Sequence, residues 1–143
     1  MVESLQFIAT LTAALFAGAA LYINVVEHPA RMMLETRMAA LQWAPSYKRA
    51  TLLQAPLALG SFVCGAVAWL LGADQRWLVA AVLIGLVVPF TLTVVMPINR
   101  QLLQPDRDLT STQTRSLLEQ WNRRHAIRTA LSLMALLIYL WLL

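Results

Sequence analysis

The sequence has few charged residues and a single cysteine. Only 13% of its 143 residues are charged, whereas 59% are hydrophobic, and the mean hydropathy is +0.65. A soluble domain of this length cannot bury so much apolar surface. The lone Cys64 excludes an internal disulfide and any Cys-x-x-Cys metal or redox motif. The composition therefore predicts an integral membrane protein.

Two common kinds of catalytic or nucleotide-binding motif are also absent. The five glycines follow no phosphate-loop pattern, so a nucleotide site is not expected. Ser46 has no histidine and acid arranged around it as in a hydrolase. The net charge of +4 comes mainly from basic residues in connections beside apolar runs, a distribution typical of membrane topology. We therefore expect no nucleic acid partner.

Four apolar runs are long enough to cross a hydrocarbon core of about 30 Å as helices. They comprise residues 5–26, 51–71, 77–96 and 126–143. The first run has no basic flank before it and is longer than the hydrophobic region of a signal peptide, so we interpret it as a retained helix. We predict an all-α, four-transmembrane-helix bundle that forms one domain over residues 1–143.

The distribution of basic residues predicts how the bundle is oriented. Residues 72–76 form a short hairpin that contains only Arg76, and no Lys or Arg precedes the first run. Nearly all other basic residues lie in the first and third connections: Arg31, Arg37, Lys48, Arg49, Arg100, Arg107, Arg115, Arg123 and Arg124. By the positive-inside rule, we expect these connections in the cytoplasm and both termini outside a cell membrane, as in a bacterial inner membrane. An outer aromatic belt is then expected from Trp69, Trp77, Tyr139 and Trp141.

Local signals predict how the helices begin and bend. Residues 32–43 have apolar side chains at helical spacing, which predicts a short interfacial helix after the first span. Thr110 followed by Gln113 resembles a capping box, so the last helix should begin near Ser111. Prolines at several membrane positions should bend or end their helices and leave backbone carbonyls in need of partners: Pro29, Pro56, Pro89 and Pro97.

Two similar patterns of polar residues lie at the inner ends of the first and last spans. Asn24, His28 and Arg31 are spaced i, i+4 and i+7, which places them on one helical face. The same spacing relates Trp121, His125 and Arg128. Both faces lie at one predicted depth and contain the only two histidines of the chain. We therefore expect His28 and His125 to line one cytoplasm-side cavity.

Further polar residues from the other two spans fall at this depth. Gln54 and Tyr47 belong to the second helix, and Asn99 and Arg100 end the third. The amides of Asn24, Gln54 and Asn99 should face the bundle interior, because hydrocarbon offers them no hydrogen-bond partner. Interhelical structural bonding is the alternative to a functional role. Four other cations are expected to extend to the interface as anchors: Lys48, Arg49, Arg123 and Arg124.

The histidines leave two kinds of chemistry open. A shielded imidazole is suited to general-base work near neutral pH, and it is also a good metal or haem ligand. Two histidines without cysteine or intramembrane carboxylates are a poor zinc or di-iron set, so no metal site is expected. A haem with His28 and His125 as axial ligands stays open on residue type alone.

Several stretches together resemble the anthrone oxygenase-like family. They are LYINVVEHPAR at 21–31, WAPSYKRA at 43–50, QAP at 54–56, MPINR at 96–100 and WNRRHAIR at 121–128. The resemblance covers essentially the whole chain. It implies a four-helix membrane protein, some of whose relatives oxidise anthrones to anthraquinones without a metal or flavin, so no cofactor is expected.

The resemblance also implies roles for the polar residues. His28 or His125 would remove a proton from an anthrone-like substrate, and Asn24, Asn99 and the arginines Arg31, Arg100 and Arg128 would stabilise the developing oxyanion. The remaining members of the predicted substrate site are Tyr22, Trp43, Tyr47, Gln54 and Trp121. The expected partners are membrane lipid, a lipophilic small molecule and oxygen, and a homo-oligomer is compatible with the sequence.

Two other functions remain alternatives at this stage. The first is a non-catalytic membrane module that binds a lipid, a quinone-like ligand or a partner subunit. The second is an electron-transfer protein with a bis-histidine haem. An absorption spectrum would distinguish the haem protein, and oxygen uptake with an anthrone would distinguish an enzyme from a binding module.

Overall fold

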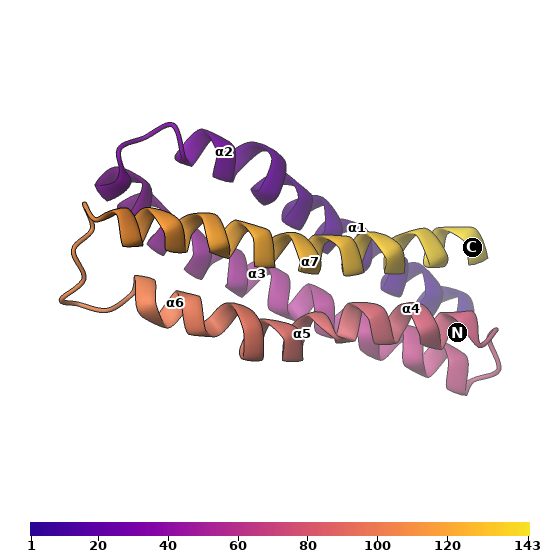
Figure 1. Ribbon diagram of the computed structural model, residues 1–143. Helices are drawn as coiled ribbons and strands as arrows, with labels where there is room; N and C mark the ends of the chain where they lie inside the picture. Colours follow the sequence, from indigo (N-terminus) through magenta and orange to yellow (C-terminus); the bar gives the residue numbers. More distant parts are fainter.

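The computed structural model describes residues 1–143 and consists of four antiparallel helical rods without strands (Figure 1). The bounds of the helices are α1 (Val2–Tyr22), η1 (Ile23–Glu27), α2 (His28–Arg31), α3 (Thr36–Leu70), α4 (Arg76–Gly85), α5 (Val87–Phe90), η2 (Thr91–Val95), α6 (Met96–Leu102) and α7 (Thr112–Leu142), where η marks a π-helical turn. The first rod is formed by α1, η1 and α2, and the third by α4, α5, η2 and α6. All four rods are long and apolar enough to cross a membrane, which confirms the predicted four-helix membrane fold.

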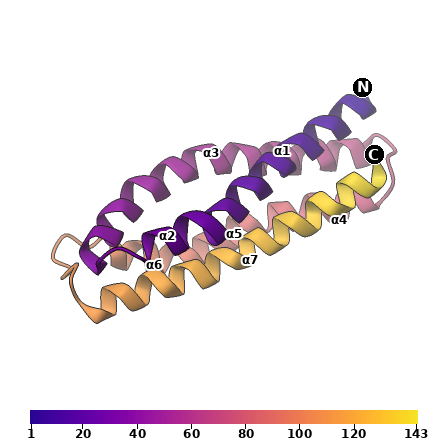
Figure 2. The same ribbon diagram turned by 90° about the horizontal axis from the view of Figure 1, so that it is seen from above.

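Each rod packs against two neighbours. The first rod contacts α3 and α7, and α4 contacts the same two helices from the other side. Both termini lie at the end of the bundle that carries the short hairpin, and the two longer connections lie at the opposite end (Figures 1 and 2). The ends of the first and last rods that carry His28 and His125 are therefore neighbours, as the sequence predicts.

The short hairpin between α3 and α4 depends on a glycine. Gly72 has φ of 98°, in the left-handed region that residues with a Cβ rarely adopt. Its N–H donates to the Trp69 carbonyl at 2.9 Å, and the Ala73 N–H donates to the Ala68 carbonyl at 3.1 Å. These bonds satisfy carbonyls at the end of α3 and reverse the chain within a few residues.

The expected separate interfacial helix is not formed. The connection after α2 is a short turn, and α3 then runs without interruption from Thr36 to Leu70. Ala39, Ala40 and Trp43 are buried in a core with residues from α6 and α7, so this apolar face packs against the bundle. Pro56 does not break α3 either. The apolar face of residues 32–43 was identified correctly, but it packs against other helices of the protein and not against the membrane interface.

The start of α7 differs from the expected capping box by one residue. Ser111 is the N-cap, and its hydroxyl accepts a hydrogen bond from the Thr114 N–H at 3.1 Å. The backbone and hydroxyl of Thr110 instead donate to the Asp108 carboxylate, at 2.8 and 2.6 Å. These bonds lower the pKa of Asp108. The predicted helix start is confirmed, whereas the predicted capping residue was wrong.

The outer aromatic belt is only partly formed. Trp141 is 83% exposed, but Trp77 and Tyr139 are buried with their ring centroids 5.0 Å apart. The Tyr139 hydroxyl donates to the Ser61 carbonyl at 3.2 Å. A Cβ at position 65 would lie 2.1 Å from that hydroxyl, so Gly65 makes room for it. Small residues on the helices let these rings enter the core instead of facing lipid.

Two prolines follow π-helical turns, and the backbone there stays irregular. η1 directly precedes His28 and Pro29, and η2 directly precedes Met96 and Pro97. Proline lacks an N–H for the carbonyl one turn earlier, so such segments need other donors. Arg124 donates to the Val94 carbonyl of η2 at 2.8 Å. Arg124, expected only as an interface anchor, thus also supplies a donor to this irregular backbone.

Candidate functional site

Asn24 in η1 connects the first rod to α7 through its side-chain amide. Nδ2 donates to the backbone carbonyl of Asn122 at 3.0 Å and to the Asn122 side-chain oxygen at 2.7 Å. Oδ1 of Asn24 faces Nδ1 of His125 at 2.9 Å and accepts from the Thr129 hydroxyl at 2.5 Å. A backbone carbonyl only accepts, so the contact with Asn122 fixes which end of the Asn24 amide carries the nitrogen.

This arrangement sets the tautomer of His125. Because Oδ1 of Asn24 is an acceptor, Nδ1 of His125 must carry the hydrogen. In a neutral imidazole, Nε2 then keeps its lone pair. The side chain of His125 is buried, and its hydrogen bond to Asn24 uses Nδ1 alone. Nε2 is therefore left to accept a proton.

The second polar group is centred on Glu27 and Arg31. Their ion pair is 2.7 Å long, and Arg31 is only 3% exposed. The same carboxylate oxygen accepts from the hydroxyl of Ser46 and from Nε2 of Gln42 at 3.4 Å. Nε of Arg31 donates to Oε1 of Gln42. Glu27 thus neutralises a buried guanidinium and joins the first rod to α3.

Arg31 also sets the tautomer of His28. Its Nη1 lies 3.3 Å from Nδ1 of His28. A guanidinium only donates, so Nδ1 accepts and the neutral ring carries its hydrogen on Nε2. His28 and His125 therefore present opposite groups at Nε2, a donor on the first and an acceptor on the second.

Three aromatic side chains expected at the site pack beside the histidines. The Trp121 ring lies 5.8 Å from the His28 ring and 4.9 Å from the His125 ring. Trp43 stacks on Tyr47 at 4.9 Å and meets Trp121 edge to face at 5.9 Å. Trp121 is thus the one side chain in ring contact with both histidines.

Arg128 is a cation without an acidic partner. Its Nη2 donates to Oε1 of Gln54 at 3.0 Å, and the guanidinium lies 5.7 Å from the Phe16 ring centroid. The two ion pairs of the protein involve Arg31 and Arg76 instead. Nε of Arg128 is enclosed without a partner, as are Nε2 of Gln54 and Nε1 of Trp121. The region therefore has more hydrogen-bond donors than acceptors, which favours an anionic or oxygen-rich ligand.

Two adjoining cavities lie along these donors. The smaller is about 10 Å³, and its wall includes Trp121, His125, Gln54 and Arg128. The larger is about 140 Å³ and shares Gln54, Arg128 and Thr51 with it. His28 lies in neither wall, so these two cavities do not bring both histidines together as the sequence led us to expect. The Trp121 ring lies beside His28 and, together with His125, forms part of the wall of the smaller cavity.

Six other expected site residues line neither cavity: Asn24, Arg31 and Trp43, whose contacts are described above, and Tyr22, Asn99 and Arg100. Tyr22 is 57% exposed on the lipid-facing surface, and Arg100 is exposed at the end of the third rod. Asn99 is buried, but its Oδ1 has no partner. The predicted burial of Gln54 and Asn99 is confirmed, and the predicted hydrogen bonding holds for Asn24 and Gln54 only.

Sequence reasoning missed four members of these groups: Gln42, Ser46, Asn122 and Thr129. Ser46 was considered only as a nucleophile, and the others are common polar residues with no motif of their own. Only helical spacing could have indicated two of them, because Asn122 and Thr129 lie on the same face of α7 as His125. Only the packing of the first rod against α7 shows that Asn24 reaches both.

The residues present do not fit a bis-histidine haem. Nε2 of His28 carries a hydrogen and is not free to coordinate iron, because Nδ1 accepts from Arg31. His28 does not border the cavity beside His125, and that cavity of about 10 Å³ cannot hold a porphyrin. No three His, Cys, Asp or Glu side chains lie together as a metal site would require.

Comparison with known proteins finds one family model whose matched region contains most of the residues of this site. A family model described as "Anthrone oxygenase" matches residues 43–138, which is more than half of the chain. The matched region includes Trp43, Gln54, Asn99, Trp121 and His125 and begins after the first rod. No curated protein and no solved structure matches the chain.

Proposed function

The chain belongs to the anthrone oxygenase family, and from this membership we propose that His125 removes a proton from a lipophilic, anthrone-like aromatic substrate whose anion then reacts with dioxygen. The methylene group of an anthrone lies between two aromatic rings, and its conjugate base places negative charge on the carbonyl oxygen. The site needs a base for the methylene proton and a cation for that oxygen.

One observation carries this proposal. Arg128, a guanidinium without an acidic partner, lies in the same cavity wall as His125, whose Nε2 is free to accept a proton. A cation inside an apolar bundle is unfavourable unless an anion or strong acceptor meets it. An anion that forms during the reaction satisfies this requirement. The unpartnered Nε2 of Gln54 is a second donor for the same oxygen.

The reaction balances with dioxygen as the only oxidant. His125 takes one methylene proton, and the resulting anion transfers an electron to dioxygen. The two radicals combine into a carbon–oxygen bond, which gives a peroxide. The protonated His125 returns its proton to the peroxide, which regenerates the base. Loss of the remaining hydrogen from that carbon as a proton, with cleavage of the oxygen–oxygen bond and departure of hydroxide, then yields the new carbonyl group and one molecule of water.

His28 has a different part in this scheme. Because its Nδ1 accepts from Arg31 and its ring contacts Trp121, it supports the aromatic wall beside the base. Glu27 neutralises Arg31 and leaves Arg128 as the cation available to substrate. We therefore assign His28 and Arg31 as positioning residues, and His125, Arg128 and Gln54 as groups that contact the substrate.

The non-catalytic binding module is the remaining alternative for the same cavities. It shares the preference for an acceptor-rich ligand and differs only in turnover. The haem alternative is disfavoured by the tautomer of His28 and by the small space beside His125.

We further propose that the bundle lies in a cell membrane with both termini outside. Most of the Lys and Arg residues lie in the half of the bundle that carries the two longer connections, chiefly in the helix turns there. The positive-inside rule then places the candidate site toward the cytoplasm.

Oxygen uptake by the purified protein in lipid nanodiscs tests the proposed activity. With anthrone as substrate, we expect uptake of one dioxygen for each anthraquinone formed, at a rate above that of empty nanodiscs. Binding of anthrone without uptake above this background would contradict the oxygenase and support the binding module.

A further inference from the structure

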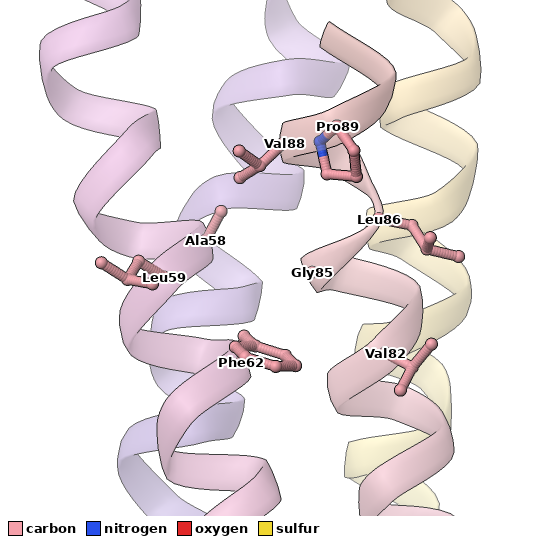
Figure 3. A pocket seen from close by; sticks show the side chains of 8 residues that line it. All are labelled: Ala58, Leu59, Phe62, Val82, Gly85, Leu86, Val88 and Pro89. Carbon is pink, nitrogen blue, oxygen red and sulfur yellow. The ribbon is translucent and has the colours of Figure 1, made fainter. Parts of the chain in front are cut away.

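An apolar groove lies between α3 and the third rod. Its volume is about 360 Å³, within the range of roughly 300 to 1,000 Å³ found for ligand sites. No polar side chain borders it. The lining residues are Ala58, Leu59, Phe62, Val82, Gly85, Leu86, Val88 and Pro89 (Figure 3). Most of these side chains are partly exposed on the surface that faces lipid, so the groove is open to the bilayer.

The shape of the groove is encoded by an interruption of the third rod. α4 ends at Gly85, and α5 begins at Val87. Pro89 has no N–H for the Gly85 carbonyl four residues earlier. Phe62 reaches from α3 toward Gly85, and a Cβ there would lie 2.8 Å from its ring (Figure 3). Glycine and proline thus hold the third rod in the form that leaves this space beside α3.

The groove adjoins the candidate site. Ala58 and Val88 line both the groove and the cavity of about 140 Å³. That cavity in turn shares Gln54 and Arg128 with the small cavity beside His125. Three hollows therefore follow one another from the lipid-facing surface to the base.

We propose that this groove admits the substrate from the bilayer and binds its fused apolar rings while the oxygen-bearing end reaches Arg128. This inference rests on the proposed oxygenase function. The cavity at Arg128 is below the usual size of a ligand site, so a polycyclic molecule held there must extend beyond it. The adjoining groove is apolar and large enough for that extension.

A phospholipid is a poorer occupant than an aromatic anion. Its acyl chain suits the apolar walls, but its charged head group remains at the membrane surface. The groove leads through the inner cavity to Arg128, which is bonded to Gln54 within the bundle, and a charged head group would have to leave water to reach it. An aromatic ketone carries its oxygen on the ring system itself and places it at Arg128 without burying a permanent charge.

Photolabelling tests occupancy without requiring turnover. Anthraquinone, whose excited carbonyl inserts into neighbouring C–H bonds, would be irradiated with the full-length protein in nanodiscs and the adducts mapped by mass spectrometry. We expect adducts on groove residues such as Leu59 and Val88. Adducts spread evenly over the lipid-facing helices, or absent from the groove, would overturn the proposal.

Two substitutions test whether the groove controls binding. Val88→Trp fills the junction between the groove and the inner cavity, and Leu59→Trp narrows the groove from α3. Both residues are partly exposed, so the larger ring does not enter the core. We expect each variant to raise the Kd for anthraquinone and the KM for anthrone about tenfold with kcat little changed. Val79→Trp is the control, since Val79 is similarly exposed on α4 and lines none of the three hollows.

The outcomes separate this proposal from the proposed activity. If the groove is labelled but anthrone is not oxidised, the substrate route stands and the oxygenase assignment fails. If anthrone is oxidised while the groove and control variants share the wild-type KM, the oxygenase stands and the route fails. Binding of a phospholipid that anthraquinone does not displace would overturn the route in favour of a lipid site.

Discussion

Nδ1 of His125 donates its hydrogen to Oδ1 of Asn24 at 2.9 Å, across the contact between the last and first rods. Asn122 orients the Asn24 amide from the other side. The direction of this chain of hydrogen bonds leaves the lone pair of His125 on Nε2, and His125 and Arg128 both line the cavity of about 10 Å³. The base and the cation are thus positioned by contacts between different rods.

Replacement of Asn24 should separate positioning from binding. In Asn24→Ala, His125 loses the acceptor that fixes its tautomer, so we expect kcat to fall about tenfold or more while KM changes little. Nitrogen NMR of labelled histidine should show one tautomer of His125 in the wild type and a mixture in the variant. Asn122→Ala, which removes only the orienting partner, should give a smaller loss. An unchanged tautomer in Asn24→Ala would contradict the argument.

Removal of the Arg128 charge should affect stability and activity in opposite directions. Arg128→Met keeps much of the side-chain volume and removes a guanidinium that has no acidic partner. We expect the thermal midpoint to stay the same or rise, because a poorly compensated intramembrane charge is lost, and we expect turnover to fall at least about a hundredfold. Arg123→Met is the control, since Arg123 is exposed. A loss of stability in Arg128→Met that Arg123→Met does not share would show that Arg128 is structural.

Gly65 should be intolerant of a methyl group. A Cβ would lie 2.1 Å from the Tyr139 hydroxyl and 3.1 Å from Cβ of Ala81. We expect Gly65→Ala to destabilise the bundle by about 1–3 kcal/mol through overpacking. Gly18→Ala is the matched control, because no atom lies within 4 Å of its added Cβ. Combining Gly65→Ala with Tyr139→Phe should restore part of the lost stability, and a double variant no more stable than Gly65→Ala would contradict this explanation.

The proposed orientation is checked by fusions after Leu143. A periplasmic alkaline phosphatase should be active at this position and green fluorescent protein should be dark, because both termini are proposed to lie outside. A fusion after Arg107 should show the reverse pattern. Fluorescence at Leu143 would place the termini in the cytoplasm and invert the proposed orientation.

The sequence predicted the fold well because its main signals are local. Length and hydropathy identified the four spans, and the single short hairpin fixed which ends lie together. The same local reasoning failed for residues 32–43, where an amphipathic pattern cannot show whether its apolar face meets lipid or Trp121. It failed again for Trp77 and Tyr139, which pack against each other in the core, because the space for the Tyr139 hydroxyl is provided by Gly65 on another rod.

The candidate site was predicted in part for the same reason. Helical spacing placed His28 beside Arg31 and His125 near Arg128, and inner-end position brought Trp43 and Gln54 to the same region. Spacing cannot show which long-range partner an amide selects, so the contact between Asn24 and Asn122 was missed. The unequal roles of the histidines follow from such partners, Arg31 for one ring and Asn24 for the other.

Hydrogen exchange at the substrate methylene, measured without oxygen, tests the central claim most directly. Anthrone would be mixed with the protein in deuterated buffer under argon, and deuterium incorporation would be followed by mass spectrometry against empty nanodiscs. If His125 is the base, the wild type should accelerate exchange, and His125→Ala should reduce it to the background rate while His28→Ala retains part of it. Exchange by His125→Ala at the wild-type rate would contradict the assignment of His125 as the base.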